Sequence, residues 1–154
     1  MTIRSRTVLD FAGRTYYNEA IDLAACRKRG KTMGRFLNPD NSAFQVALNS
    51  KIYVDKTGLL EYTNSVLDTV DAYICNSRPR RFGKSFTANM LAAYYSRGCE
   101  SEAMFSRLNI GKTEEFKDHL NKYDVIHMDI QWFLSNCKKV DQIVEFITKS
   151  VLSE

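Results

Sequence analysis

The chain has no long apolar run. No stretch approaches the roughly 20 apolar residues that a helix needs to cross a bilayer. Near the N-terminus, charged residues such as Arg4, Asp10 and Arg14 interrupt the apolar core that a signal peptide requires. These absences predict a protein without membrane contact, and we expect it to be cytoplasmic.

Paired cysteines, repeats and proline-rich stretches are also missing. The four cysteines are widely separated, at positions 26, 75, 99 and 137, and form no C-x-x-C pair. Such spacing is typical of reduced thiols and argues against a disulfide scaffold or a zinc site. Hydrophobic residues make up 44% of the 154-residue chain and only two residues are proline. This composition favours one folded domain over disorder.

Acidic residues do not balance the basic ones in the N-terminal part of the chain. The first 50 residues contain eight Lys or Arg and four Asp or Glu, whereas the remainder contains fourteen of each. The excess gathers at residues 27–31 and Arg35. Two interpretations stay open. The cluster contacts nucleic acid or an acidic partner, or it is the solvated end of a helix over residues 16–29 closed by Gly30.

The most informative stretch that is present is Ser-Arg-Pro-Arg-Arg-Phe-Gly-Lys-Ser, residues 77–85. We expect a strand over residues 72–77 and a helix over residues 84–97. A loop that ends in Gly-Lys-Ser between a strand and a helix is the context of a phosphate-binding site. Unpaired N–H groups at a helix N-terminus attract phosphate oxygens, which supports this hypothesis.

Three residues of this stretch would carry the chemistry. Gly83 would let the backbone approach the anion. Lys84 would reach the β- and γ-phosphates, and the Ser85 hydroxyl would bind Mg²⁺. The full motif, G-x-x-x-x-G-K-[ST], expects glycine at position 78, where this chain has arginine.

Arg78, Arg80 and Arg81 give the same stretch a dense positive charge. In one interpretation they neutralise phosphate charge and partly replace the tighter cradle of the missing glycine. In the other they form a solvated basic loop or contact a partner. The residues alone leave both interpretations open.

Helices and strands alternate in the fold that we expect. Apolar residues at helical spacing predict helices over residues 57–67 and 140–151, and residues 111–121 suggest another. A second strand is expected over residues 124–130. This alternation predicts an α/β fold with a parallel sheet of βαβ units. Because two strands are too few for a complete sheet, we expect a P-loop core that is incomplete at the C-terminus and follows a helical or loop extension.

Two segments together resemble the predicted AAA-ATPase-like proteins of bacteria. They are Tyr-Val-Asp-Lys-Thr-Gly-Leu-Leu at residues 53–60 and the stretch at residues 77–85, where the family also carries arginine in place of the first glycine. Supporting matches lie at residues 33–39, 104–110 and 123–129. The resemblance implies a P-loop NTPase core, ATP and Mg²⁺ as cofactors, and phosphate and Mg²⁺ roles for Lys84 and Ser85.

The resemblance also implies domain limits and a longer chain. Residues 1–32 fall outside it as a basic N-terminal extension, and residues 33–154 correspond to the N-terminal part of the AAA-ATPase-like domain. Similar chains are longer and commonly carry a nuclease-like C-terminal domain, so we expect further sequence after Glu154. This leaves open contact with nucleic acid through such a domain and assembly into a homo-oligomer.

Residues outside the loop have two interpretations each. The ring of Tyr53 could stack on adenine while Asp55 and Lys56 orient the loop, or the segment could be a brace in which Asp55 or Thr57 caps the next helix. Asp129 ends an apolar stretch, as a Walker B carboxylate that binds Mg²⁺ would. In the additional-strand class that the family resembles, however, the acidic strand comes later, so a structural role for Asp129 is the alternative.

The first functional hypothesis is an ATP-binding domain, the N-terminal part of an AAA-like ATPase. Hydrolysis would then need an acidic strand beyond Glu154, and no residue stands out as the base that activates water. The alternative is a non-hydrolysing regulatory or nucleic-acid-contacting module whose basic loop binds polyanions. For Mg²⁺ we expect Ser85 and Asp129. The expected nucleotide-binding residues are Tyr53, Asp55, Arg78, Arg80, Arg81, Phe82, Gly83, Lys84, Ser85 and Phe86.

Overall fold

The structure is a computed structural model that describes residues 8–9, 15–16, 34–79, 81–137 and 139–154. Several features expected from the sequence therefore lie outside the described residues. They are the greater part of the helix over residues 16–29, the basic residues 27–31, Cys26 and Arg80.

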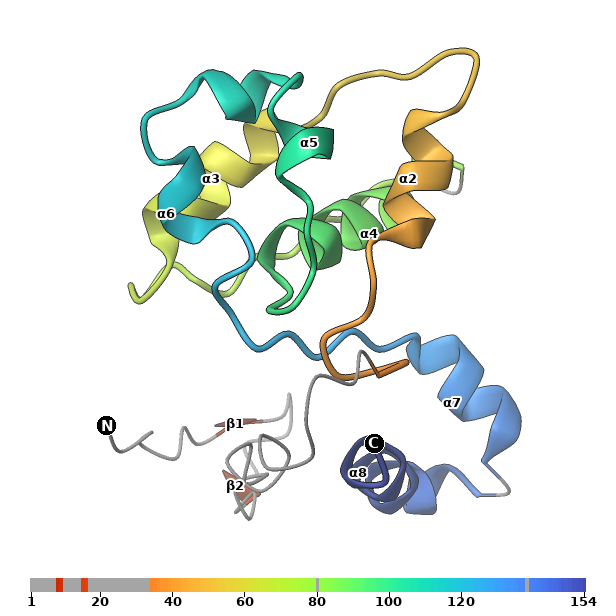
Figure 1. The fold of residues 1–154 in the computed structure, drawn as a ribbon. Coiled ribbons are helices and arrows are strands. Elements are labelled where there is room, and N and C mark those ends of the chain that lie inside the picture. Colours follow the sequence, from red (N-terminus) through yellow and green to blue (C-terminus); the bar gives the residue numbers. More distant parts are fainter. Residues whose placement is uncertain (1–7, 10–14, 17–33, 80, 138) are drawn as a thin grey trace. The chain divides into compact units, whose positions relative to one another are not determined.

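The described residues are mainly helical (Figure 1). Two short strands, β1 (Val8–Leu9) and β2 (Thr15–Tyr16), pair antiparallel with Val8 opposite Tyr16. The helices that follow are α2 (Ser42–Leu48), α3 (Gly58–Val66), α4 (Lys84–Tyr95), α5 (Glu102–Phe105), η1 (Asn109–Lys112), α6 (Phe116–His119), α7 (Ile130–Asn136), η2 (Val140–Gln142) and α8 (Ile143–Leu152).

The expectation of a parallel βαβ sheet is wrong for the described residues. Residues 72–79 have no regular secondary structure, and the side chains of Tyr73 and Ile74 are 78% and 42% exposed. No backbone hydrogen bond joins residues 73–77 to another described segment. A strand needs a neighbouring strand to pair its N–H and C=O groups. Because the described chain supplies none at this place, the apolar run stays an irregular segment.

The second expected strand, over residues 124–130, is also wrong. This stretch pairs through isolated bridges only, from Ile126 to Leu37 in the antiparallel sense and, just before it, from Tyr123 to Ser96 in the parallel sense. Its neighbours are the irregular chain near Leu37 and the end of α4. Neither of them is a strand, so the isolated bridges do not continue into a sheet. Ile130 already belongs to α7.

Three of the helices expected from the sequence are confirmed. Helix α3 confirms the helix over residues 57–67, α4 confirms that over residues 84–97, and η2 with α8 confirms that over residues 140–151. The stretch 111–121 contains the end of η1 and the short α6 rather than one helix. Helices α2, α5 and α7 were not expected.

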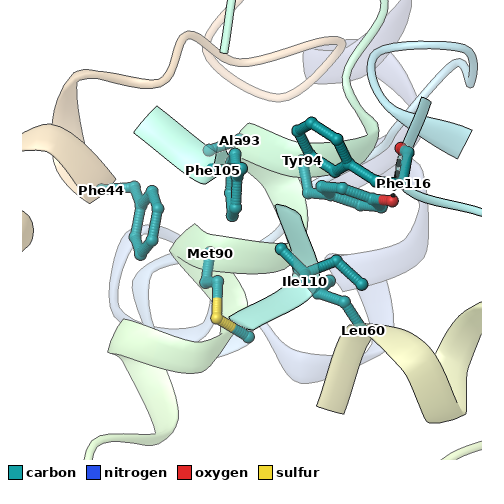
Figure 2. Packing of buried hydrophobic residues seen from close by; sticks show 8 residues of the cluster. All are labelled: Phe44, Leu60, Met90, Ala93, Tyr94, Phe105, Ile110 and Phe116. Atoms are coloured by element: carbon teal, nitrogen blue, oxygen red, sulfur yellow. Dashed lines mark hydrogen bonds between the residues drawn. The ribbon is translucent and has the colours of Figure 1, made fainter. Parts of the chain in front are cut away.

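The chain divides into two units, Met33–Asp129 and a second unit that includes Ile130–Glu154. In the first unit, α2 packs against α4, and η1 contacts α3, α5 and α6. These helices enclose a core in which aromatic and aliphatic side chains from all six of them meet (Figure 2). The hydroxyl of Tyr94 donates a hydrogen bond of 2.9 Å to the carbonyl of Phe116 inside this core, which satisfies a buried polar group. The core residues are Phe44, Leu60, Met90, Ala93, Tyr94, Phe105, Ile110 and Phe116.

The C-terminal end of α4 is completed by a distant side chain, that of Asn121. Its Nδ2 atom donates to the carbonyls of Ala93, Tyr94 and Ser96 at 3.1, 3.2 and 3.0 Å. The last carbonyls of a helix have no hydrogen-bond donor within the helix. The side-chain amide of Asn121 is the donor for these carbonyls. Asn121 itself has φ 55°, a left-handed conformation that asparagine tolerates well. Helix α4 is thereby held at the end opposite to Lys84.

The second unit has a smaller aromatic core of its own. Phe133 of α7 is fully buried and contacts Trp132 and Phe146, with ring centroids 5.1 and 5.6 Å away. On α8, Val151 is buried whereas Val144 is 64% exposed, so only part of the expected apolar stripe faces a core. Among the described helices, none combines the length and apolar character that a membrane span requires.

Candidate functional site

The Gly-Lys-Ser sequence lies where α4 begins. Gly83 is the N-cap of the helix with φ 78°, a left-handed conformation that favours glycine because it has no Cβ. Both the N–H and the hydroxyl of Thr87 donate to the Gly83 carbonyl, at 2.9 and 3.1 Å. The sharp turn at Gly83 therefore leads directly into the first turn of the helix.

The first turn of α4 presents its polar groups to solvent. The N–H groups of Lys84, Ser85 and Phe86 precede the first intrahelical hydrogen bond of the helix, so they are available to an anion. The side chains of Lys84 and Ser85 are exposed. The ammonium group of Lys84 donates a hydrogen bond to the carbonyl of Arg78, six residues earlier. This contact closes the loop of residues 77–85, hereafter the 77–85 loop.

The remaining loop residues that the structure describes are exposed. Arg78 donates from Nε to the side-chain oxygen of Asn76 at 3.4 Å, and Arg81 adopts φ 69°. The side chain of Phe82 is 59% exposed. The two arginines thus place positive charge at the surface beside the start of α4, and their role in nucleotide binding stays a prediction.

Tyr53 and Phe86, two of the expected nucleotide-binding residues, lie side by side. Their ring centroids are 5.6 Å apart, and Phe44 contacts both rings at 6.4 and 5.9 Å. The Tyr53 hydroxyl is buried and has no hydrogen-bond partner among the described residues. Burial, together with the charge of Asp55, raises the pKa of Tyr53 to about 12. Stacking of Tyr53 on adenine stays a prediction.

Asp55 anchors the segment before α3 to a distant part of the chain. Its Oδ1 accepts hydrogen bonds from the N–H and hydroxyl of Thr57, at 2.9 and 2.7 Å. Its Oδ2 accepts one from the N–H of Asn109 at 2.8 Å. Partial burial alone would raise the pKa of this carboxyl, but these hydrogen bonds and the nearby charge of Lys112 lower it overall. Asp55 is therefore held as a carboxylate.

Thr57 extends the same anchor. Its hydroxyl accepts a hydrogen bond from the N–H of Ile110 at 3.1 Å, and the residue is fully buried. Asp55 and Thr57 together bind the first turn of η1 to the start of α3. The alternative expected from the sequence was a cap of α3 by Asp55 or Thr57, but the N-cap residue Thr57 makes no side-chain capping hydrogen bond. The contacts observed join the segment to η1 instead, and they place the backbone of Lys56 between two fixed neighbours.

Asp129 lies apart from these residues in sequence and ends the extended stretch before α7. Its side chain is exposed. No group of three or more His, Cys, Asp or Glu side chains in the described part of the chain could hold a metal ion. A role for Asp129 in metal binding stays a prediction.

Sequence reasoning missed the contribution of Asn109 and Lys112. Asn109 lies within the 104–110 segment, but it acts through its backbone N–H, which any residue except proline provides. Lys112 donates to the Asn109 side chain at 3.3 Å and lies near Asp55. Asp55 and Asn109 are 54 residues apart in the chain. No local sequence pattern could therefore have revealed their hydrogen bond.

Comparison with known families gives one match. A family model described as a predicted AAA-ATPase matches residues 42–154. The chain belongs to the predicted AAA-ATPase family. The resemblance stated from the sequence is thereby confirmed, and the match includes Asp55, Thr57 and the whole 77–85 loop. Searches of curated proteins and of solved structures found no match.

Proposed function

We propose that this member of the predicted AAA-ATPase family binds Mg·ATP, with the phosphates at the 77–85 loop. The observation that carries the proposal is the placement of Gly-Lys-Ser at the start of a 12-residue helix, with Gly83 in the left-handed conformation. Family membership supports ATP as the ligand, and the loop geometry supports the start of α4 as the site of phosphate binding.

The groups around the loop suit a polyphosphate. Three N–H groups at the start of α4 point toward the positive end of the helix dipole, and Lys84 is exposed beside them. The Lys84 ammonium is bonded to the neutral carbonyl of Arg78. A phosphate oxygen is a stronger acceptor than a carbonyl because it carries charge, so exchange of one partner for the other is favourable.

The fit to Mg²⁺ is more limited. Mg²⁺ usually keeps several waters and binds substrate phosphates with only one or two protein ligands. The exposed hydroxyl of Ser85, in the first turn of α4, can serve as one such ligand. The described residues contain no cluster that would bind the metal alone, so we expect Mg²⁺ to bind together with the nucleotide.

Thermal unfolding with and without Mg·ATP tests the proposal. Mg·ATP at 100 times its Kd adds about 2.7 kcal/mol to the free energy of unfolding, which raises the Tm of a chain of this size by roughly 5–10 °C. We expect this rise in the wild type and its loss in Lys84→Ala. Lys122→Ala removes another exposed lysine, outside the loop, and should respond like the wild type.

Two results would contradict the proposal. One is a wild type without a saturable rise in Tm. The other is an equal rise with Mg·ATP and with inorganic polyphosphate that disappears in high salt, because such behaviour is that of a general polyanion site. The second result would favour the non-hydrolysing, basic-loop alternative.

A further inference from the structure

A second lysine, Lys56, lies against the backbone at the start of α4. Its Nζ atom donates a hydrogen bond of 3.4 Å to the carbonyl of Phe82. The same atom lies 6.0 Å from the ring centroid of Phe86. A Cβ atom built on Gly83 would be 3.0 Å from it. The ammonium group thus occupies the space beside Gly83 that a side chain at that position would fill.

The neighbours of Lys56 are fixed independently of the loop. Asp55 is bonded to the N–H of Asn109, and the hydroxyl of Thr57 accepts from the N–H of Ile110. The backbone at Lys56 is therefore anchored on both sides to η1. A lysine on an anchored backbone loses less conformational freedom when it binds an anion than one on a mobile loop.

Within the part of the chain that the structure describes, no ion pair neutralises the charge of Lys56. Asp55 next to it is occupied by hydrogen bonds from Thr57 and Asn109. No described carboxylate forms an ion pair with Lys56, whose side chain is exposed. The only acceptor that Lys56 uses among the described residues is the neutral carbonyl of Phe82.

Lys56 and Lys84 contact the 77–85 loop in the same way. Each ammonium group donates to a backbone carbonyl of that loop, Lys56 to Phe82 and Lys84 to Arg78. We propose that Lys56 is a second phosphate-binding lysine of this site and that it contributes charge toward a nucleoside polyphosphate. This inference rests on the proposed function, since it assigns a further residue to the same site.

The substitution Lys56→Met separates the charge of the side chain from its packing. Methionine retains an unbranched stem over Phe86 but has no ammonium group, whereas Lys56→Arg retains the charge. Lys51→Ala removes an exposed lysine five residues earlier and is the matched control. Because the side chain of Lys56 is exposed, we expect all three variants to unfold at the wild-type temperature without nucleotide.

Isothermal titration with Mg·ATP, Mg·ADP and AMP then measures the role of the charge. We expect Lys56→Met to weaken Mg·ATP binding about 10- to 100-fold, the usual effect of losing a charge-assisted hydrogen bond. The loss should be smaller for Mg·ADP and smallest for AMP. Lys56→Arg should remain near the wild type, and Lys51→Ala should be unchanged.

The outcomes distinguish this inference from the function on which it rests. A wild type that does not bind Mg·ATP overturns both. A wild type that binds, with Lys56→Met within about twofold of it, overturns the inference alone. Equal losses for all three nucleotides in Lys56→Met also overturn it, because they would mean that Lys56 only supports the loop and does not contact phosphate.

Discussion

The carboxylate of Asp55 accepts a hydrogen bond from the backbone N–H of Asn109, 2.8 Å away and 54 residues later in the chain. With the two hydrogen bonds from Thr57, this contact holds the segment before α3 against η1. The position of Lys56 depends on this contact. Through Lys56, which bonds the carbonyl of Phe82, the contact also affects the 77–85 loop.

Removing this carboxylate should destabilise the fold. Asp55→Ala leaves the N–H of Asn109 and the hydroxyl of Thr57 without their acceptor, and we expect a loss of about 2 kcal/mol in the free energy of unfolding. Urea denaturation at pH 7 measures it. Asp71→Ala removes an exposed carboxylate whose side chain forms no hydrogen bond with a described residue, and it should stay within about 0.5 kcal/mol of the wild type. A wild-type value for Asp55→Ala would contradict the anchoring role.

The contribution of Asp55 should depend on pH in one direction. Its pKa in the folded protein is lower than the usual 3.8, so the folded state favours the ionised form more than the unfolded state does. The stabilisation is therefore fully present above about pH 4–5 and is lost as the pH falls through the lowered folded pKa. The difference between the wild type and Asp55→Ala should shrink in this acid range. An equal difference at pH 7 and pH 2 would show that the charge contributes nothing.

The hydroxyl of Tyr53 should be dispensable for folding. Because the hydroxyl is buried and no described residue bonds to it, Tyr53→Phe should leave the free energy of unfolding at pH 7 unchanged or raise it slightly. The folded pKa of about 12 exceeds the usual value of 10.0, so the folded state binds the proton more tightly. Stability from this group is present below pH 10 and falls as the pH rises from 10 to 12. The wild type should lose more stability over this range than Tyr53→Phe, as measured by urea denaturation at each pH.

Glycine should be required at position 83 and not at position 58. Gly83→Ala forces a Cβ into a backbone with φ 78° and against Lys56, and we expect a cost of about 1–2 kcal/mol. Gly58 at the start of α3 has no atom within 4 Å of an added Cβ, so Gly58→Ala should be neutral or stabilising by up to about 1 kcal/mol. Thermal unfolding of the two variants compares them. Equal effects would mean that the turn at Gly83 does not need glycine.

Local patterns in the sequence were sufficient for the long helices and for the turn before α4. Leu60 and Thr63 share a buried face of α3 as their spacing predicts, and Gly83 adopts a left-handed conformation, which costs glycine less than it costs most other residues. Helix α2 was missed because it buries only Phe44. A single buried residue gives no periodic signal, and the asparagines and proline before it are typical of loops.

Properties that depend on distant residues could not be predicted from the sequence. The apolar run near Tyr73 and Ile74 has the composition of a strand, yet whether a strand forms depends on a partner, and the described chain provides none at that place. The same limit applies to the candidate site. The motif indicated Lys84, but the proximity of Lys56 to Gly83 follows from contacts of Asp55 and Thr57 with η1, which lie more than 50 positions away.

The side chain of Asn121 has a consequence for synthesis of the protein on the ribosome. It bonds the carbonyl of Ser96, 25 residues earlier, so α4 is translated well before the residue that completes its end. At about 5–20 residues per second, the delay is roughly 1–5 s. During that interval the carbonyls of Ala93 and Tyr94 lack the side-chain donor that they have in the folded protein. The hydrogen bonds that complete the end of α4 can therefore form only after Asn121 has been synthesised.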